Sequence, residues 1–346
     1  MIDFAPRRRR ALHLAAAALA APALSACGGS NAATLWTPSS NAPLNAAIAR
    51  FAALAPDTSN CLLQADASSQ PWSAGHQADR QLFVGSAVKT FILAQFLRDV
   101  EAGRNGLSEA QLCEINDAVR TPGSPVFGSL TGQTPYRSAL EAMIAHSDNL
   151  GTDIALAAAE PDRVRALITQ AGLTSTRIPD STRKLFSYLA GAPSGTDLGW
   201  EGMQRIARNE PTGYTSRSDV INTQQTMVST ASEMVSWYRQ SLSGAFFQRP
   251  ETVNEYRRIQ AQADALWRTV PSGLMSYGKG GSIDWEDFHA LCIAGQMLVN
   301  VGVGSVPVTF SFTLNWRGAA LSTDRTDEFI AAVADVLRAA ATAMRS

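Results

Sequence analysis

The stretch that decides the fold is Phe83-Val84-Gly85-Ser86-Ala87-Val88-Lys89-Thr90, which continues as a mostly apolar run to Arg98 and is stopped by Gly103. Apolar residues surround this predicted helix on every side up to Arg98, a pattern typical of a helix buried on all faces. Positions three apart share one helix face, so Ser86 and Lys89 present a hydroxyl and an amine side by side. The sequence therefore places a nucleophile beside a lysine in a dry environment.

Burial disfavours the ammonium form of a lysine, and a second cation nearby lowers its pKa further, so Lys89 could take the proton from Ser86. A purely structural interpretation is also open, with a serine at the helix start and a lysine that extends to the surface. The pattern Ser-x-x-Lys occurs three times, beginning at Ser86, Ser181 and Ser276. The pattern alone therefore does not separate the two interpretations.

The chain has 346 residues, of which 45% are hydrophobic and 17% charged, enough for one large domain with a core. Its first residues are typical of a targeting segment: four arginines at 7–10 precede a mostly apolar run over 11–24. That run is shorter than the roughly 20 residues needed to cross a bilayer. We expect residues 1–26 to be a signal peptide that is removed on export.

The string Leu24-Ser25-Ala26-Cys27 resembles the lipobox of bacterial lipoproteins. This resemblance implies that Cys27 carries the lipid and that the mature protein is a periplasmic, membrane-anchored lipoprotein. A plain secretory peptide cleaved nearby is the alternative. Residues 27–42 are then expected to form a flexible tether to the folded body.

Charge and cysteine content limit the partners. Without residues 1–26 the chain has 25 basic residues (29 − 4) and 29 acidic residues (30 − 1), a net charge of −4, which argues against a nucleic-acid footprint. Cys61, Cys113 and Cys292 remain, mostly as buried small hydrophobic residues, with one disulfide left open as a possibility. The sequence shows no ligand cluster, so we expect no metal and no cofactor, and a monomer.

The hydrophobic pattern predicts an α/β fold. The antiparallel sheet is built from both ends of the chain, with terminal helices on one face and a mostly helical subdomain of about 86–266 on the other. We expect the folded domain to span residues 43–346. Helices are expected at 45–54, through most of 106–171 with breaks at 121–125 and 130–134, within 177–190, at 231–242 and 252–267, and from 324 onward. Strands are expected at 60–64, in a run ending near 84, and at 274–279, 290–299 and 308–316, the last with one buried face.

Two further stretches carry polar groups suited to chemistry. His146-Ser147-Asp148-Asn149 stands at a helix start, and Lys279-Gly280-Gly281-Ser282 lies on a predicted strand. Each also has a structural interpretation, as a helix cap and as a solvated strand edge. The two glycines would let a ligand approach the backbone.

In order, the three stretches read Ser-x-x-Lys, Ser-Asp-Asn and Lys-x-Gly, and the chain resembles class A β-lactamases and penicillin-binding proteins. Residues 121–126 and 230–234 also look like segments of that family. The resemblance covers nearly the whole mature length and implies a β-lactamase or transpeptidase-like fold.

The resemblance also implies roles. Ser86 would attack an amide or lactam carbonyl while Lys89 takes its proton, and Ser147 would relay a proton to the leaving nitrogen. Lys279 would supply positive charge, and Asn149 would bind the acyl side chain.

Two more residues complete the implied site. The oxyanion would lie between the backbone N–H groups of Ser86 and Ser282, with Gly281 also lining the substrate site.

The match fails in two places. Hydrolytic members carry a Glu-x-x-Leu-Asn segment whose glutamate activates water, whereas residues 177–184 contain no glutamate. Asp180 is the nearest carboxylate and is our candidate for that role; Glu201 would need an unusual fold-back. Gly280 also replaces the usual threonine or serine, so a hydroxyl for the substrate carboxylate is missing there.

These departures favour acylation over turnover. The first hypothesis is a serine hydrolase that forms an acyl-enzyme at Ser86 and hydrolyses β-lactams. The alternatives are a D,D-peptidase or esterase acting on cell-wall peptides or small esters, and a catalytically silent, lipid-anchored binding protein.

Overall fold

The computed structural model describes residues 37–66 and 71–345. The predicted signal peptide, Cys27 and most of the predicted tether lie outside the described residues. Within the predicted tether, residues 37–38 form the short strand β1 (Thr37–Pro38), and helix α1 begins at Ala42.

Both ends of the described chain contribute to one six-stranded sheet, in the order β1-β3-β2-β10-β9-β8. Its other strands are β2 (Ser59–Ala65), β3 (Trp72–His76), β8 (Met275–Trp285), β9 (Phe288–Val301) and β10 (Gly304–Arg317). The predicted sheet from both termini is confirmed. All pairings are antiparallel except that of β1 with β3, which is parallel.

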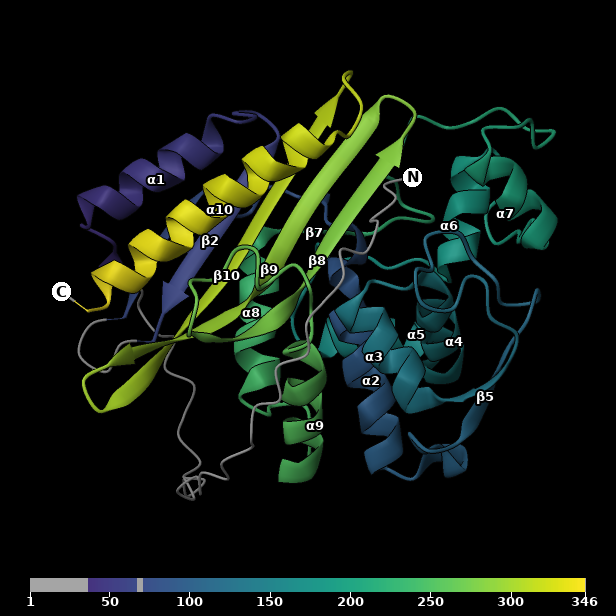
Figure 1. The fold of residues 1–346 in the computed structure, drawn as a ribbon, viewed down its shortest axis with the longest axis horizontal. Helices are drawn as coiled ribbons and strands as arrows, with labels where there is room; N and C mark the ends of the chain where they lie inside the picture. The colour runs from purple at the N-terminus through teal and green to yellow at the C-terminus, as the bar shows by residue number, and fades with distance from the viewer. Residues whose placement is uncertain (1–36, 67–70, 346) are drawn as a thin grey trace, which may run out of the picture. The chain divides into compact units, whose positions relative to one another are not determined.

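Helices cover both faces of this sheet. Helices α1 (Ala42–Ala52) and α10 (Thr323–Ala343) lie side by side on one face, and α8 (Ala231–Leu242) packs on the other (Figure 1). The expectation of one buried face for β10 was therefore wrong, because Thr309 and Ser311 are as buried as Phe310. Gln296 satisfies one of these polar groups by donating to the Thr309 hydroxyl at 2.9 Å.

The predicted buried helix is confirmed. It begins as the short 3-10 helix η1 (Gly85–Val88) and continues as α2 (Lys89–Glu101). From Leu82 to Leu97 every residue is buried except Ser86, which is partly exposed. One accessible hydroxyl therefore stands at the head of a helix that is otherwise enclosed.

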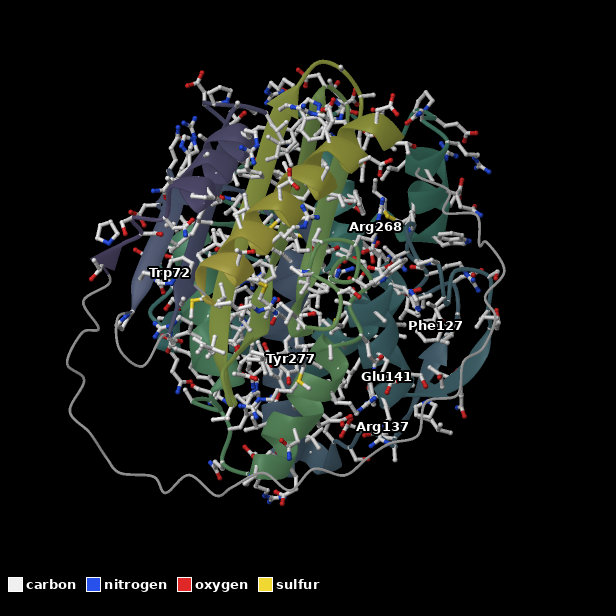
Figure 2. The ribbon with its side chains drawn as sticks, turned by 60° about the vertical axis from the view of Figure 1, so that its left-hand side comes forward. Trp72, Phe127, Arg137, Glu141, Arg268 and Tyr277 are labelled. Atoms are coloured by element: carbon white, nitrogen blue, oxygen red, sulfur yellow. The ribbon has the colours of Figure 1, made fainter. Side chains whose placement is uncertain are left out.

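Most of the remaining helices belong to the predicted helical block, beside the β8 edge of the sheet (Figure 1). They are α3 (Tyr136–Ala145), α4 (Asn149–Ala159), α5 (Pro161–Gln170), α6 (Thr182–Leu189), α7 (Gly199–Ala207) and α9 (Pro250–Gln260). Figure 2 shows Trp72 on the β3 side of the molecule and Phe127 among the helices on the opposite side.

The helical prediction was wrong for residues 107–120 and 126–129. Instead, the segment up to residue 135 forms two short paired strands, β5 (Leu112–Ile115) and β6 (Gly132–Pro135), with an irregular loop between them that includes the predicted break at 121–125. Pro and Gly residues around Thr121-Pro122-Gly123 prevent a continuous helix there. Residues 191–214, which are rich in glycine, proline and polar residues, contain α7. In the described part of the chain, no helix is long and apolar enough to cross a membrane.

Candidate active site

Strand β8 lies directly against the turn that carries Ser86. A Cβ added to Gly281 would lie 2.1 Å from the Val84 carbonyl oxygen and 2.8 Å from the Ser86 nitrogen. Gly85, at φ +55°, would place a Cβ 2.8 Å from the Ser282 nitrogen. Only glycine permits this approach at both positions. The absence of a side chain at Gly281 thus allows the backbone of the η1 turn to pack against strand β8. This packing places the backbone of Ser282 next to that of Ser86.

Lys89 links the first motif to the second. Its amine is fully buried and donates to the Ser147 carbonyl oxygen at 2.8 Å, the Ser147 hydroxyl at 3.2 Å and the Asn149 side-chain oxygen at 2.8 Å. These acceptors take the three N–H bonds of an ammonium group. The hydrogen bond expected between Lys89 and Ser86 is therefore not made in this arrangement.

Lys89 and Lys279 are both buried, and the Lys279 amine donates to the Gly280 carbonyl oxygen at 2.7 Å. Burial lowers the pKa of Lys89 well below its ordinary value, and the charge of Lys279 lowers it further, while Asp148 and Asp153 act in the opposite direction. Burial also lowers the pKa of Lys279 to about 8, against the influence of Asp264 and Cys292. Burial thus makes both amines give up a proton more readily than an exposed lysine does, which favours their use as proton acceptors.

The segment between α3 and α4 combines a helix cap with the second motif. Asp148 caps α4 by accepting from the Gly151 N–H at 2.8 Å and also binds the backbone N–H groups of Val126 and Phe127. Ser147 has φ +57°, a conformation that costs a non-glycine residue about 1–3 kcal/mol. The cap interpretation holds for Asp148, whereas the Ser147 hydroxyl faces Lys89.

The Asn149 amide is engaged at both ends. Its oxygen accepts from Lys89, and its nitrogen donates to the Pro122 carbonyl oxygen at 2.8 Å. It therefore ties the 121–124 loop to the base of the site. Its role in binding an acyl side chain stays a prediction.

Packing explains the unusual third motif. A Cβ added to Gly280 would lie 2.8 Å from the Cβ of Ala265, in the segment after α9. The space that a threonine or serine side chain would begin to occupy is thus filled by Ala265. The contact with Ala265 thus explains why position 280 carries no substrate-binding hydroxyl.

This contact gives a testable expectation. Gly280→Ser should lower the free energy of unfolding by about 1–3 kcal/mol because it overpacks this contact. Ala265→Gly in the same chain should recover at least about 1 kcal/mol of that loss, measured by urea unfolding in a double-mutant cycle. Strict additivity of the two single changes would contradict the packing explanation.

Asp180 is already occupied by structural partners. Its carboxylate accepts from Arg165 at 2.5 Å and from the Gln225 amide at 2.8 Å. Burial acts to raise its pKa, but these hydrogen bonds outweigh burial and hold the pKa below its ordinary value. Its role in activating water stays a prediction, which an unchanged deacylation rate in Asp180→Asn would contradict. Glu201, on α7, is exposed and pairs with Arg205.

No motif in the sequence pointed to Asp153, which is buried on α4, one turn after Asn149. The available signal was its charge, since α4 otherwise contains no acidic or basic residue.

Two further expectations concern cysteines and metals. Cys61, Cys113 and Cys292 are buried and free. Among residues 37–66 and 71–345, no group of three or more His, Cys, Asp or Glu side chains could hold a metal ion.

The sheet, the buried helix and the grouped lysines and serines together define the β-lactamase and transpeptidase-like class of folds. The chain belongs to the β-lactamase enzyme family, whose family model matches residues 43–303. No curated protein matches the chain in sequence.

Solved structures agree on the fold. A β-lactamase from Xanthomonas campestris is 19% identical, with 86% of this chain and 97% of that chain covered and a TM-score of 0.63. A class A β-lactamase from Mycobacterium abscessus is 17% identical, with 85% and 98% covered and a TM-score of 0.62. The protein named PBP-A is 12% identical, with 89% and 98% covered and a TM-score of 0.62.

Proposed function

We propose that this protein is a serine hydrolase that forms an acyl-enzyme at Ser86 and hydrolyses β-lactam amides. One observation carries the proposal: the amine of Lys89 is buried, has a lowered pKa and donates to Ser147 and Asn149 of the second motif. A purely structural lysine would extend its charge into water. Lys89 is instead fully buried, three residues after the partly exposed Ser86.

The acylation step follows from this arrangement. Neutral Lys89 has two N–H bonds and a lone pair, so it releases one of its three acceptors and takes the Ser86 proton, directly or through water, as the serine oxygen attacks the lactam carbonyl carbon. The backbone N–H groups of Ser86 and Ser282 stabilise the oxyanion. As the carbon–nitrogen bond breaks, the nitrogen takes a proton from the Ser147 hydroxyl, which is replenished from Lys89 along their 3.2 Å hydrogen bond. Lys279 provides positive charge beside this path.

Deacylation lacks an evident base. In the described residues, the hydrogen bonds of Lys89, Ser147 and Asn149 include no carboxylate. We therefore propose that hydrolysis of the acyl-enzyme is slower than its formation.

A chromogenic cephalosporin tests both steps. A burst of colour of about one equivalent per protein, followed by a slow linear phase, is expected when deacylation limits turnover. Rapid linear colour without a burst would contradict slow deacylation but support hydrolysis. Neither colour nor a covalent adduct would overturn the enzyme proposal and favour a silent binding protein.

The second candidate is a D,D-peptidase or esterase that uses the same acyl-enzyme on cell-wall peptides or small esters. The missing glutamate favours it, because long-lived acyl-enzymes suit transfer better than hydrolysis. A small thioester cleaved faster than any β-lactam would favour this candidate.

We also propose export as a lipoprotein. The Leu-Ser-Ala-Cys string motivates this, and membrane association that persists in Cys27→Ala would contradict it.

A further inference from the structure

The buried carboxylate of Asp153 lies on α4, one turn after Asn149, and has no part in the mechanism above. We propose that Asp153 is a positioning residue: it fastens two walls of the site to α4 and supplies negative charge beside the buried lysines. The inference rests on the proposed function, because one of its readouts is acylation of Ser86.

The partners of Asp153 require a carboxylate. One oxygen accepts from the Thr182 N–H at 2.6 Å, and the other accepts from the Arg183 N–H and the Thr121 hydroxyl, both at 3.1 Å. The two backbone N–H groups can only donate, one to each carboxylate oxygen, whereas the single hydrogen of the Thr121 hydroxyl is shared with the Val119 carbonyl oxygen, 3.0 Å away. An asparagine would turn an N–H₂ group, which only donates, toward at least one backbone N–H. Shape alone would therefore not satisfy this position.

These partners come from two different segments. Thr121 precedes Pro122, whose carbonyl oxygen accepts from Asn149, so the same loop is tied to α4 at two points. Thr182 and Arg183 are the first residues of α6. Asn149 and Asp153 lie one turn apart, about 6 Å along the axis of α4. Asp153 thus connects the start of α6 to the helix that presents Asn149 to Lys89.

Its charge is not neutralised by a neighbouring arginine. The Arg183 guanidinium turns away to Asp197, at 2.9 Å, although the backbone of Arg183 binds Asp153. The charges that act on Lys89 are those of Lys279, Asp148 and Asp153. Burial raises the pKa of Asp153, and the backbone N–H donors act against this. Removing its charge leaves Asp148 as the remaining anion of this group.

The test compares Asp153→Asn with Asp99→Asn. Asp99 is a buried aspartate on α2, paired with Arg163 and ten residues beyond Lys89, about 15 Å along the helix. Asp153→Asn should lower the second-order rate of acylation by penicillin about 30-fold, because it displaces the start of α6. Asp99→Asn should leave this rate within about threefold of wild type, whatever its melting temperature.

The pH profile separates charge from mere stability. Acylation needs neutral Lys89, so its rate falls on the acidic side of the profile. Loss of the Asp153 charge favours the neutral amine, and the acidic limb should move about one unit to lower pH. No shift in Asp153→Asn, or an equal shift in Asp99→Asn, would overturn the inference.

Amide hydrogen exchange gives a readout that does not depend on acylation. At least one of the Thr182 and Arg183 amides should exchange at least about tenfold faster in Asp153→Asn, because asparagine keeps only one of the two oxygen acceptors. If the wild-type protein is never acylated, the proposed function fails, but the exchange rates still test whether Asp153 anchors the start of α6. Unchanged exchange in Asp153→Asn would overturn this anchoring role.

Discussion

Ser86→Ala is expected to abolish the covalent adduct with penicillin and to lower acylation at least about 10⁴-fold, because no other group takes the place of the nucleophile. The change removes one oxygen from a partly exposed side chain, so the fold should be unaffected. Intact mass after incubation with penicillin measures the result. An adduct of the same mass on Ser86→Ala would contradict this account.

The chain supplies a matched control at Ser276, which begins another Ser-x-x-Lys pattern. Ser276 and Lys279 lie on strand β8, where residues three apart point to opposite faces. In the remaining copy, the Ser181 hydroxyl caps α6 by accepting from the Lys184 N–H at 3.0 Å. Ser276→Ala should therefore keep the adduct.

Lys89→Met is expected to lower acylation about 10³-fold, because the serine loses its proton acceptor. Methionine has similar length and no charge to desolvate, so the variant should remain folded. The rate of penicillin adduct formation across pH 5–9 measures this effect. A rate near that of wild type would exclude Lys89 as the base, and Lys184→Met serves as the control that should leave the rate unchanged.

The same variant should change how stability depends on pH. The lowered pKa means that the unfolded chain binds the Lys89 proton more tightly than the folded protein does. Stability therefore rises with pH up to the unfolded pKa, and falls as pH drops and the unfolded chain takes up this proton. Lys89→Met should flatten this dependence in urea unfolding measured at several pH values.

Local patterns were sufficient for the sheet and the buried helix. Because α2 carries apolar residues on every side, no face of it favours contact with water, and the sequence alone predicts that this helix is buried. Period-two alternation located β10, yet it did not show that Thr309 and Ser311 are also buried, since that depends on which helices cover the second face.

Contacts between distant segments could not be read from the sequence. Ala265 fills the space beside Gly280, and the Val84 carbonyl lies against Gly281; each contact joins residues whose spacing carries no motif. Asp153 could have been suspected as the single charge in an apolar helix. Its three partners, however, come from the 121–124 loop and the start of α6, whose positions only the folded chain defines.

The three motifs were recognised because their chemistry needs fixed residue types at short spacing. The sequence did not show whether the amines of Lys89 and Lys279 are buried or which groups they bind. Their burial, and the absence of Ser86 from the hydrogen bonds of Lys89, are properties of the assembled site.

Peptide mapping of the wild-type protein after brief exposure to penicillin tests the central claim most directly. The account predicts a mass increase equal to one intact penicillin, carried by the peptide that contains Ser86. No adduct at any time together with no hydrolysis, or an adduct on a different residue, would contradict it.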